Sequence, residues 1–171
     1  MSGARSRRKG HDWERKLVRW FKGLGFQTER NLTETRQGSS GDIIVECLCP
    51  NFHSPSDREE NHQRLVVECK HQKSPRPWAA LDQAVKAVGD DITNSLPVAI
   101  VKQDRKPAQV WLNWHDAKRW GLPTTEGNGS EWEFRSRKPR KNSKQRYVFA
   151  AYITNLEAFE RWITESLIQI T

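Results

Sequence analysis

The sequence predicts an α/β fold, in which a central mixed β-sheet is flanked by helices. Short apolar runs rich in β-branched residues, which are typical of buried strands, recur at 43–45, 65–67, 97–101, 110–114 and 147–153. Other segments carry apolar residues three and four positions apart, the spacing of amphipathic helices. A chain of 171 residues is long enough for one domain with a substantial core.

The chain opens with a basic segment followed by a helix. Residues 1–10 carry several cations and no apolar anchor, which predicts a flexible arm. A helix is expected from Asp12, as its N-cap, to about Gly23, because glycine commonly ends a helix. The apolar stripe of this helix is formed by Trp13, Leu17, Trp20 and Leu24.

The remaining elements follow the same two patterns. Strands are expected at 26–32, 43–49, 64–71, 97–101, 110–114 and 147–153. Helices are expected at 78–89, at 115–120 and after a capping box formed by Thr154 and Glu157. The polar, Gly- and Pro-containing segments 33–41, 50–63 and 122–146 are expected to be loops. We therefore expect a single domain over 11–171, with its core at 11–120 and a basic loop, a strand and a helix at 121–171.

The charge of the chain indicates a polyanionic partner. The formal net charge is +8 and the pI about 9.7, which favours nucleic acid over a merely basic soluble protein. Two cationic runs, at 5–9 and 135–146, are expected to bind the phosphate backbone, and Trp132 is a candidate for stacking on a base. The candidate DNA-binding residues are Arg5, Arg7, Arg8, Lys9, Arg15, Arg30, Arg36, Arg137, Lys138, Arg140 and Lys141.

Other classes of protein are disfavoured. No run of about 18 apolar residues occurs, and no apolar segment follows the basic start, so we expect neither a transmembrane helix nor a secretory signal. Three cysteines, few and odd in number, indicate a reducing, cytoplasmic setting without a disulfide framework. A zinc site remains an alternative, although its Cys-x-Cys spacing is tighter than usual. Its ligands would be Cys47, Cys49, His53 and His62.

Ionisable residues accompany two of the apolar runs. Asp42 precedes the run at 43–45, and Glu68 and Lys70 follow the run at 65–67. Side chains alternate along a strand, so Glu68 and Lys70 point to the same side, and Asp42 joins them if the two strands pair. The sequence therefore predicts two carboxylates and an ammonium at one edge of the sheet.

These groups suit the hydrolysis of a phosphodiester. Asp42 and Glu68 can hold Mg²⁺, which prefers oxygen ligands, and the backbone carbonyl of Cys69 can add a further ligand. A bound metal polarises the phosphoryl oxygen and lowers the pKa of a water, while Lys70 can stabilise the developing charge. Glu14, beside the apolar stripe of the first helix, can complete the site directly or through water. The alternative is that Glu14 only pairs with neighbouring cations.

The motif Gly41-Asp42 followed by Glu68-x-Lys70 resembles that of the PD-(D/E)XK nuclease superfamily. The order of features along the chain resembles, more narrowly, the archaeal-type Holliday junction resolvases and their phage relatives. The features that match, over about 8–114, are Arg8-Lys9-Gly10, Glu14-Arg15, Gly25-Phe26, Arg30, Ser39-Ser40, Gly41-Asp42-Ile43-Ile44, Glu68-x-Lys70 and the apolar run at 97–102.

The resemblance implies a restriction-endonuclease-like sheet and a Mg²⁺-dependent endonuclease, with Mn²⁺ as a substitute, that cuts four-way DNA junctions as a homodimer. The catalytic and metal-site residues it implies are Glu14, Asp42, Glu68, Lys70 and one of the loop serines, Ser39 or Ser40. Two features depart from the pattern: Gly41 stands where proline is usual, and 50–63 is an insertion. Another nuclease of the superfamily, restriction-like or specific for flaps or branches, and a DNA-binding protein without catalysis remain alternatives.

Overall fold

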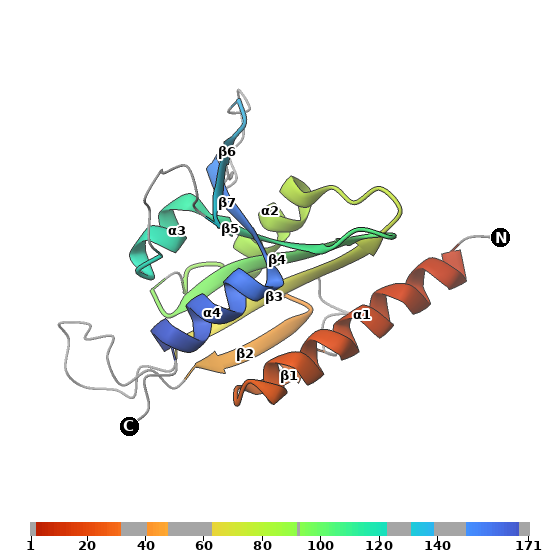
Figure 1. Cartoon of the computed structure of the whole chain (residues 1–171), viewed down its shortest axis with the longest axis horizontal. Coiled ribbons are helices and arrows are strands. Elements are labelled where there is room, and N and C mark those ends of the chain that lie inside the picture. Colours follow the sequence, from red (N-terminus) through yellow and green to blue (C-terminus); the bar gives the residue numbers. More distant parts are fainter. Residues whose placement is uncertain are drawn as a thin grey trace.

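The computed structural model describes residues 3–31, 41–47, 63–91, 93–122, 131–138 and 150–167. The described elements are, in chain order, α1 Gly3–Gly23, β1 Gln27–Arg30, β2 Ile43–Cys47, β3 Gln63–Gln72, α2 Pro77–Val88, β4 Ser95–Gln103, β5 Ala108–Asn113, α3 Trp114–Arg119, β6 Glu133–Ser136, β7 Ala150–Asn155 and α4 Leu156–Leu167 (Figure 1). None of these helices is both long and apolar enough to span a membrane.

The strands form one seven-stranded sheet in the order β1-β2-β3-β4-β5-β7-β6. Strands β3 and β4 are parallel, and every other neighbouring pair is antiparallel. The chain between β3 and β4 contains α2, as expected for a crossover between parallel strands. The predicted α/β fold with a mixed sheet flanked by helices is confirmed.

Helices cover both faces of the sheet. On one face, Leu17 and Phe21 of α1 and Phe159 of α4 share a buried cluster with side chains of the central strands, and α3 joins it. On the other face, Leu81 and Val85 of α2 pack in a second cluster against β4, β5 and β7. Strands β3 and β4 are therefore buried on both faces, which explains why they are apolar without interruption over 65–67 and 97–101.

The first helix is longer than the sequence indicated. It begins at Gly3. The expectation of a flexible arm is therefore wrong for residues 3–10, and Asp12 is not the N-cap. Arginine, lysine and alanine are good helix formers, and they extend the helix without an apolar stripe. Contact with the sheet supports this extension, because Lys9 Nζ lies 2.8 Å from Asp104 Oδ2 in the β4–β5 turn.

The C-terminal part holds three further corrections. Strand β6 lies within the expected loop 122–146, and all four of its residues are exposed, so pairing with β7 rather than an apolar pattern defines it. Helix α4 is capped by Asn155, whose Oδ1 accepts a hydrogen bond from the Ala158 N–H at 2.8 Å. The expected cap, Thr154, still belongs to β7 and donates to the Glu131 carbonyl instead. The half-buried Trp132, expected to stack on a base, packs edge-on against Trp162.

Candidate active site

The pairing of β2 with β3 brings the predicted acidic residues near one another. The ladder begins at Ile43, which pairs with Val67, so Asp42 lies just before β2 and beside the part of β3 that carries Glu68. Glu68 in turn pairs with Ala99 of β4, which packs in the cluster under α2. Residues that are paired across neighbouring strands have their side chains on the same face of the sheet. Glu68 and Lys70 therefore share the face that α2 partly covers.

Asp42 is held by the backbone of β3. Strand β3 continues beyond the start of β2. There the Cys69 N–H points toward the β2 side of the strand and donates a hydrogen bond to Asp42 Oδ2 at 2.7 Å. In an extended strand the N–H and C=O of one residue point the same way. The Cys69 carbonyl consequently points to the edge where Asp42 lies, and its role in metal binding stays an expectation.

Gly41 allows this close approach. A Cβ at this position would lie 2.9 Å from both Val66 Cγ1 and the Val67 carbonyl oxygen. Any larger residue would push the chain away from β3 and take Asp42 with it. The glycine that departs from the usual proline therefore has a structural reason in this chain.

Glu68 and Lys70 form an ion pair. Lys70 Nζ donates to Glu68 Oε1, and Glu68 is only 8% exposed. Burial alone would lower the pKa of Lys70, but the charge of Glu68, the hydrogen bond to it and the charge of Asp42 together raise it. The Lys70 side chain is therefore an ammonium at neutral pH, not a base.

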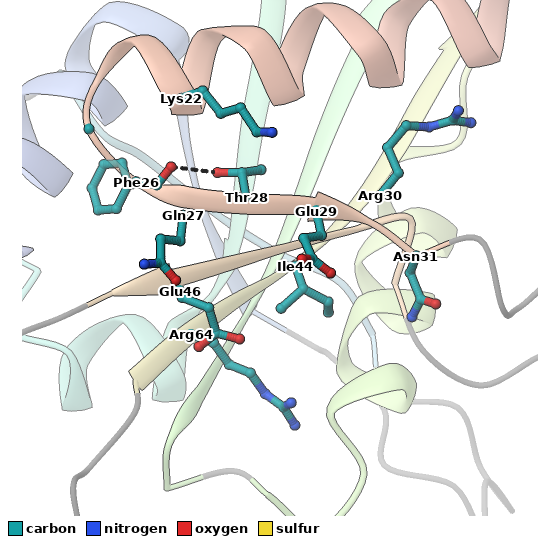
Figure 2. Close-up of a pocket in the computed structure, with 11 residues that line it drawn as sticks. Lys22, Phe26, Gln27, Thr28, Glu29, Arg30, Asn31, Ile44, Glu46 and Arg64 are labelled. Atoms are coloured by element: carbon teal, nitrogen blue, oxygen red, sulfur yellow. Dashed lines mark hydrogen bonds between the residues drawn. The ribbon is translucent and has the colours of Figure 1, made fainter.

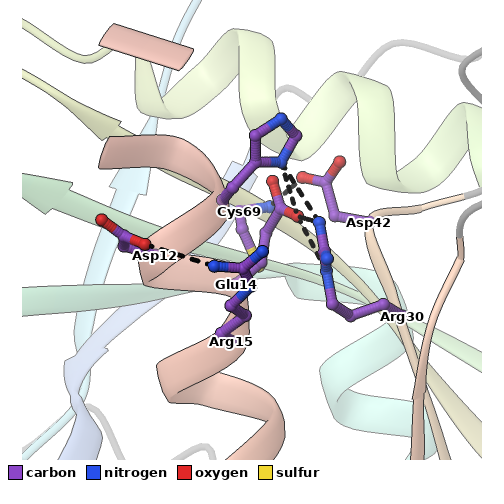
Figure 3. A network of polar contacts seen from close by, with 7 residues as sticks. Asp12, Glu14, Arg15, Arg30, Asp42 and Cys69 are labelled. Carbon is purple, nitrogen blue, oxygen red and sulfur yellow. Dashed lines mark hydrogen bonds and ion pairs between the residues drawn. The ribbon is translucent and has the colours of Figure 1, made fainter. Parts of the chain in front are cut away.

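Glu14 approaches from the other face of the sheet. It lies on α1, and its Oε2 accepts hydrogen bonds from Arg30 Nη2 at 2.5 Å and Arg30 Nε at 3.1 Å. His11 Nδ1 lies 3.2 Å from the same Arg30 Nη2 and 3.5 Å from Glu14 Oε2. Figure 3 shows Glu14, Arg30, Asp42 and Cys69 gathered in one region. Glu14 is thus ion-paired, but with Arg30 of β1 and not with a neighbouring cation on an exposed edge of the helix.

The pKa of the Cys69 thiol depends on the charged side chains of the site. Burial raises the pKa of its thiol well above the usual value, and the charges of Asp42, Glu68 and Glu14 add to the rise, while Lys70 opposes it. The thiol is free and buried. The contacts of the site join Asp42 to the Cys69 backbone, Glu68 to Lys70 and Glu14 to Arg30, and among the described residues they do not group three potential metal-binding side chains.

Several expected DNA-binding cations already have acidic partners. Lys9 contacts Asp104, Arg15 lies 3.7 Å from Asp12, and Arg30 holds Glu14. Arg137 Nη2 lies 2.5 Å from Asp82 Oδ1, and its guanidinium stacks over the Trp78 ring at 4.6 Å. Of the remaining described candidates, Arg7, Arg8 and Lys138 are exposed.

Other expected residues lie outside the described part of the chain. These are Ser39, Ser40, Arg36, Arg140 and Lys141, together with Cys49, His53 and His62 of the zinc alternative. The side chains of Arg5 and Cys47 are likewise outside it. Their roles remain expectations.

Two contributors were not anticipated from the sequence. His11 reaches Glu14 because the two residues are one helical turn apart, a spacing visible in the sequence. The hydrogen bond from Cys69 to Asp42 joins residues far apart in the chain, and no local pattern signals it.

The sheet face beyond the site is open over β1 and β2. A concavity of about 950 Å³ lies there, and Figure 2 shows Gln27, Glu29, Glu46 and Arg64 pointing to the same side. Helix α2 packs chiefly over β3, β4 and β5. The lining mixes acidic and basic side chains, so this concavity is not a uniformly positive surface for phosphate.

Comparisons with known proteins find similarity to solved structures alone. No protein-family model matches the chain, and no curated protein matches it. Among solved structures, the chain is similar to Hjc, a Holliday junction resolvase from the archaeal hyperthermophile Archaeoglobus fulgidus, with 16% sequence identity and a TM-score of 0.39. The similarity covers 58% of this chain and 72% of that one. The chemistry of the site therefore has to come from the residues themselves.

Proposed function

We propose that the chain is a metal-dependent endonuclease that hydrolyses phosphodiester bonds in DNA. The observation that carries the proposal is the hydrogen bond from the Cys69 N–H to Asp42 Oδ2, because Cys69 stands between Glu68 and Lys70 on β3. Two carboxylates and an ammonium at one edge can hold a cation and counter the charge of a phosphate. The net charge of +8 favours nucleic acid as the substrate.

Each site residue has a separate role in the proposed reaction. The Lys70 ammonium can donate to a non-bridging phosphate oxygen and stabilise the negative charge that develops there. Asp42 is oriented by the Cys69 N–H before any ligand arrives. Glu14, held by Arg30, can complete the site through a water.

The donors fit Mg²⁺. Within the described residues, no three His, Cys, Asp or Glu side chains are grouped to hold a metal ion on their own. Mg²⁺ usually binds through one or two carboxylates and completes its shell with waters and substrate phosphates. Asp42 and Glu68 would hold it, with the Cys69 carbonyl in reach of the same edge, and Mn²⁺ would substitute. When bound, the metal polarises the phosphoryl oxygen and activates a water.

A DNA-binding protein without catalysis is the second candidate. That function requires the acidic residues to be neutralised by neighbouring cations, and Glu68 with Lys70 and Glu14 with Arg30 are such pairs. Under our proposal, Mg²⁺ competes with Lys70 for Glu68. Mg²⁺ binding therefore separates the two functions.

Specificity for four-way junctions is the finer part of the proposal. It is supported by the order of motifs from Arg8 to Lys70, which resembles that of junction resolvases. A junction presents two symmetry-related strands, and a twofold homodimer would set two sites at matched positions. Flap and restriction-like cleavage are the alternatives.

The decisive experiment is cleavage of a synthetic four-way junction, a flap and a linear duplex by the wild type, with Mg²⁺ or with chelator. We expect Mg²⁺-dependent paired cuts in the junction and their loss in Asp42→Asn. Glu46→Gln is the matched control, because Glu46 lies on the same face of β2 but lines the neighbouring concavity. Calorimetry should show Mg²⁺ binding to the wild type and Glu46→Gln but not to Asp42→Asn. DNA binding without Mg²⁺ binding or cleavage would favour the non-catalytic function.

A further inference from the structure

We infer that six exposed cations at one end of the sheet bind the phosphate backbone of a duplex arm of the DNA. This basic rim consists of Arg7, Arg8, Lys73, Arg76, Arg105 and Lys106. The inference rests on the proposed function, and it specifies which surface the DNA contacts outside the cleavage site. Four of the six residues belong to neither of the cationic runs that stand out in the sequence.

Three segments far apart in the chain meet at the rim. The contact of Lys9 with Asp104, at 2.8 Å, joins the N-terminal half of α1 to the β4–β5 turn. The segments around Pro75 and Pro107 line a shared concavity of about 340 Å³. Figure 1 shows the N-terminal half of α1, the tip of β3 and the β4–β5 turn at the same end of the molecule.

The acidic residue among these segments is already neutralised. Asp104 contacts Lys9 through Oδ2 and His71 Nε2, at 3.1 Å, through Oδ1. The hydrogen bond from Lys9 and the charges of Lys9 and His71 lower the pKa of Asp104, although desolvation opposes the shift. The carboxylate of Asp104 is thus paired with Lys9 and His71 and not with a rim residue. The six rim cations therefore remain available to bind an anion.

Arg105 stands at the tip of the turn in a conformation that L-residues rarely adopt. Its φ is 64°, and the turn is closed by a hydrogen bond from the Lys106 N–H to the Gln103 carbonyl at 3.1 Å. A left-handed conformation costs a residue such as arginine about 1–2 kcal/mol relative to glycine. The turn therefore gains nothing from arginine here, while the exposed side chain adds charge at the rim.

The rim lies next to the proposed catalytic strand. Lys73 follows Lys70 by three positions, which corresponds to roughly 10 Å along an extended chain. The rise of DNA is about 3.4 Å per nucleotide, so the rim would contact phosphates about three nucleotides from the cut. On the other side of the site lies the mixed-charge concavity over β1 and β2, which favours the rim as the direction in which the arm leaves.

The test is the binding of a fluorescent linear duplex and a four-way junction, in chelator, over a range of NaCl concentrations. The rim variants are Arg105→Asn/Lys106→Gln and Lys73→Gln/Arg76→Gln. The control, Lys22→Gln/Lys86→Gln, removes the same charge from exposed positions in the last turns of α1 and α2. Thermal melting accompanies each variant, and Arg105→Asn should not lower the melting temperature because asparagine tolerates a positive φ.

We expect each rim variant to bind both DNAs at least about tenfold more weakly near 0.1 M salt and to reduce the salt slope by one to two, because each lost phosphate contact removes about 0.9 from the slope. The control should differ from the wild type by less than about twofold. If the rim variants and the control weaken equally, or the salt slope is unchanged in the rim variants, the inference is wrong. Absence of DNA binding by the wild type would instead overturn the proposed function.

Discussion

Gly41 lies against the backbone of Val67, with only 2.9 Å between the position of an added Cβ and the Val67 carbonyl oxygen. The contact sets the distance between the start of β2 and the strand that carries Glu68. It also explains how Asp42 reaches the Cys69 N–H. The geometry of the candidate site thus depends on a residue without a side chain.

Gly41→Ala should displace Asp42. Overpacking of this kind costs about 1–3 kcal/mol of unfolding free energy. A shift of about 1 Å in a catalytic group can lower the rate roughly 100-fold. We expect both effects in urea denaturation and in junction cleavage. Gly23→Ala is the control, because a Cβ there meets no atom within 4 Å; equal behaviour of the two variants would contradict the role assigned to Gly41.

The pair of Glu14 and Arg30 should behave as a unit. Both side chains are largely buried, and a charged hydrogen bond of this kind contributes about 1.5–3 kcal/mol. We expect Glu14→Gln and Arg30→Gln each to lower the unfolding free energy and the double variant to be less destabilised than their sum. Arg15→Gln, at an exposed ion pair, should change stability by less than about 0.5 kcal/mol. Strict additivity would show that Arg30 does not hold Glu14 in solution.

Lys70 should give a stability difference that is lost only at high pH. Its pKa is raised in the folded state, so its contribution is complete below the pKa of the unfolded state, about 10.4, and disappears as the pH rises through the folded value. We expect the unfolding free energies of the wild type and Lys70→Met to differ by a nearly constant amount from pH 7 to roughly pH 10 and to converge only as the pH rises further. Convergence already near pH 8 would mean that Glu68 does not hold the ammonium.

Arg137 should fasten β6 to α2 rather than bind phosphate. Its contacts with Asp82 and with the Trp78 ring connect the strand pair β6–β7 to the helix over the face of the candidate site. Asp82→Asn and Arg137→Gln should each cost about 1–3 kcal/mol of unfolding free energy and be coupled by at least about 0.5 kcal/mol in a double-mutant cycle. If Arg137 binds phosphate instead, Asp82→Asn should strengthen DNA binding while Arg137→Gln weakens it.

Asn155 should account for the start of α4. Replacing an N-cap asparagine with alanine costs about 1 kcal/mol, whereas aspartate caps as well as asparagine. We expect Asn155→Ala to lower the unfolding free energy by that amount, Asn155→Asp to keep it, and both to leave DNA cleavage unchanged. Equal stability of Asn155→Ala and the wild type would mean that Asn155 does not cap α4.

Most of the fold followed from local patterns. Apolar β-branched runs located β2, β3, β4 and β5, and apolar spacing located α2 and α4, because burial against a sheet requires those patterns. The elements that were missed lack such a pattern: β6 is exposed along its whole length, and the start of α1 is basic throughout. Thr154 satisfied the sequence rule for a cap, yet the ladder with β5 extends to Asn155 and moves the cap there.

By itself, the sequence determined that Asp42, Glu68 and Lys70 accompany buried strands and that Glu68 and Lys70 share a face, because side chains alternate along any strand. Only the tertiary structure decided the pairing of β2 with β3, which brings Asp42 to the Cys69 N–H beside Glu68. It also decided the position of Glu14, whose carboxylate is held by Arg30. Only the tertiary structure also gathered Arg7, Lys73 and Arg105 at one end. Contacts between segments far apart in the chain depend on packing, which no local pattern encodes.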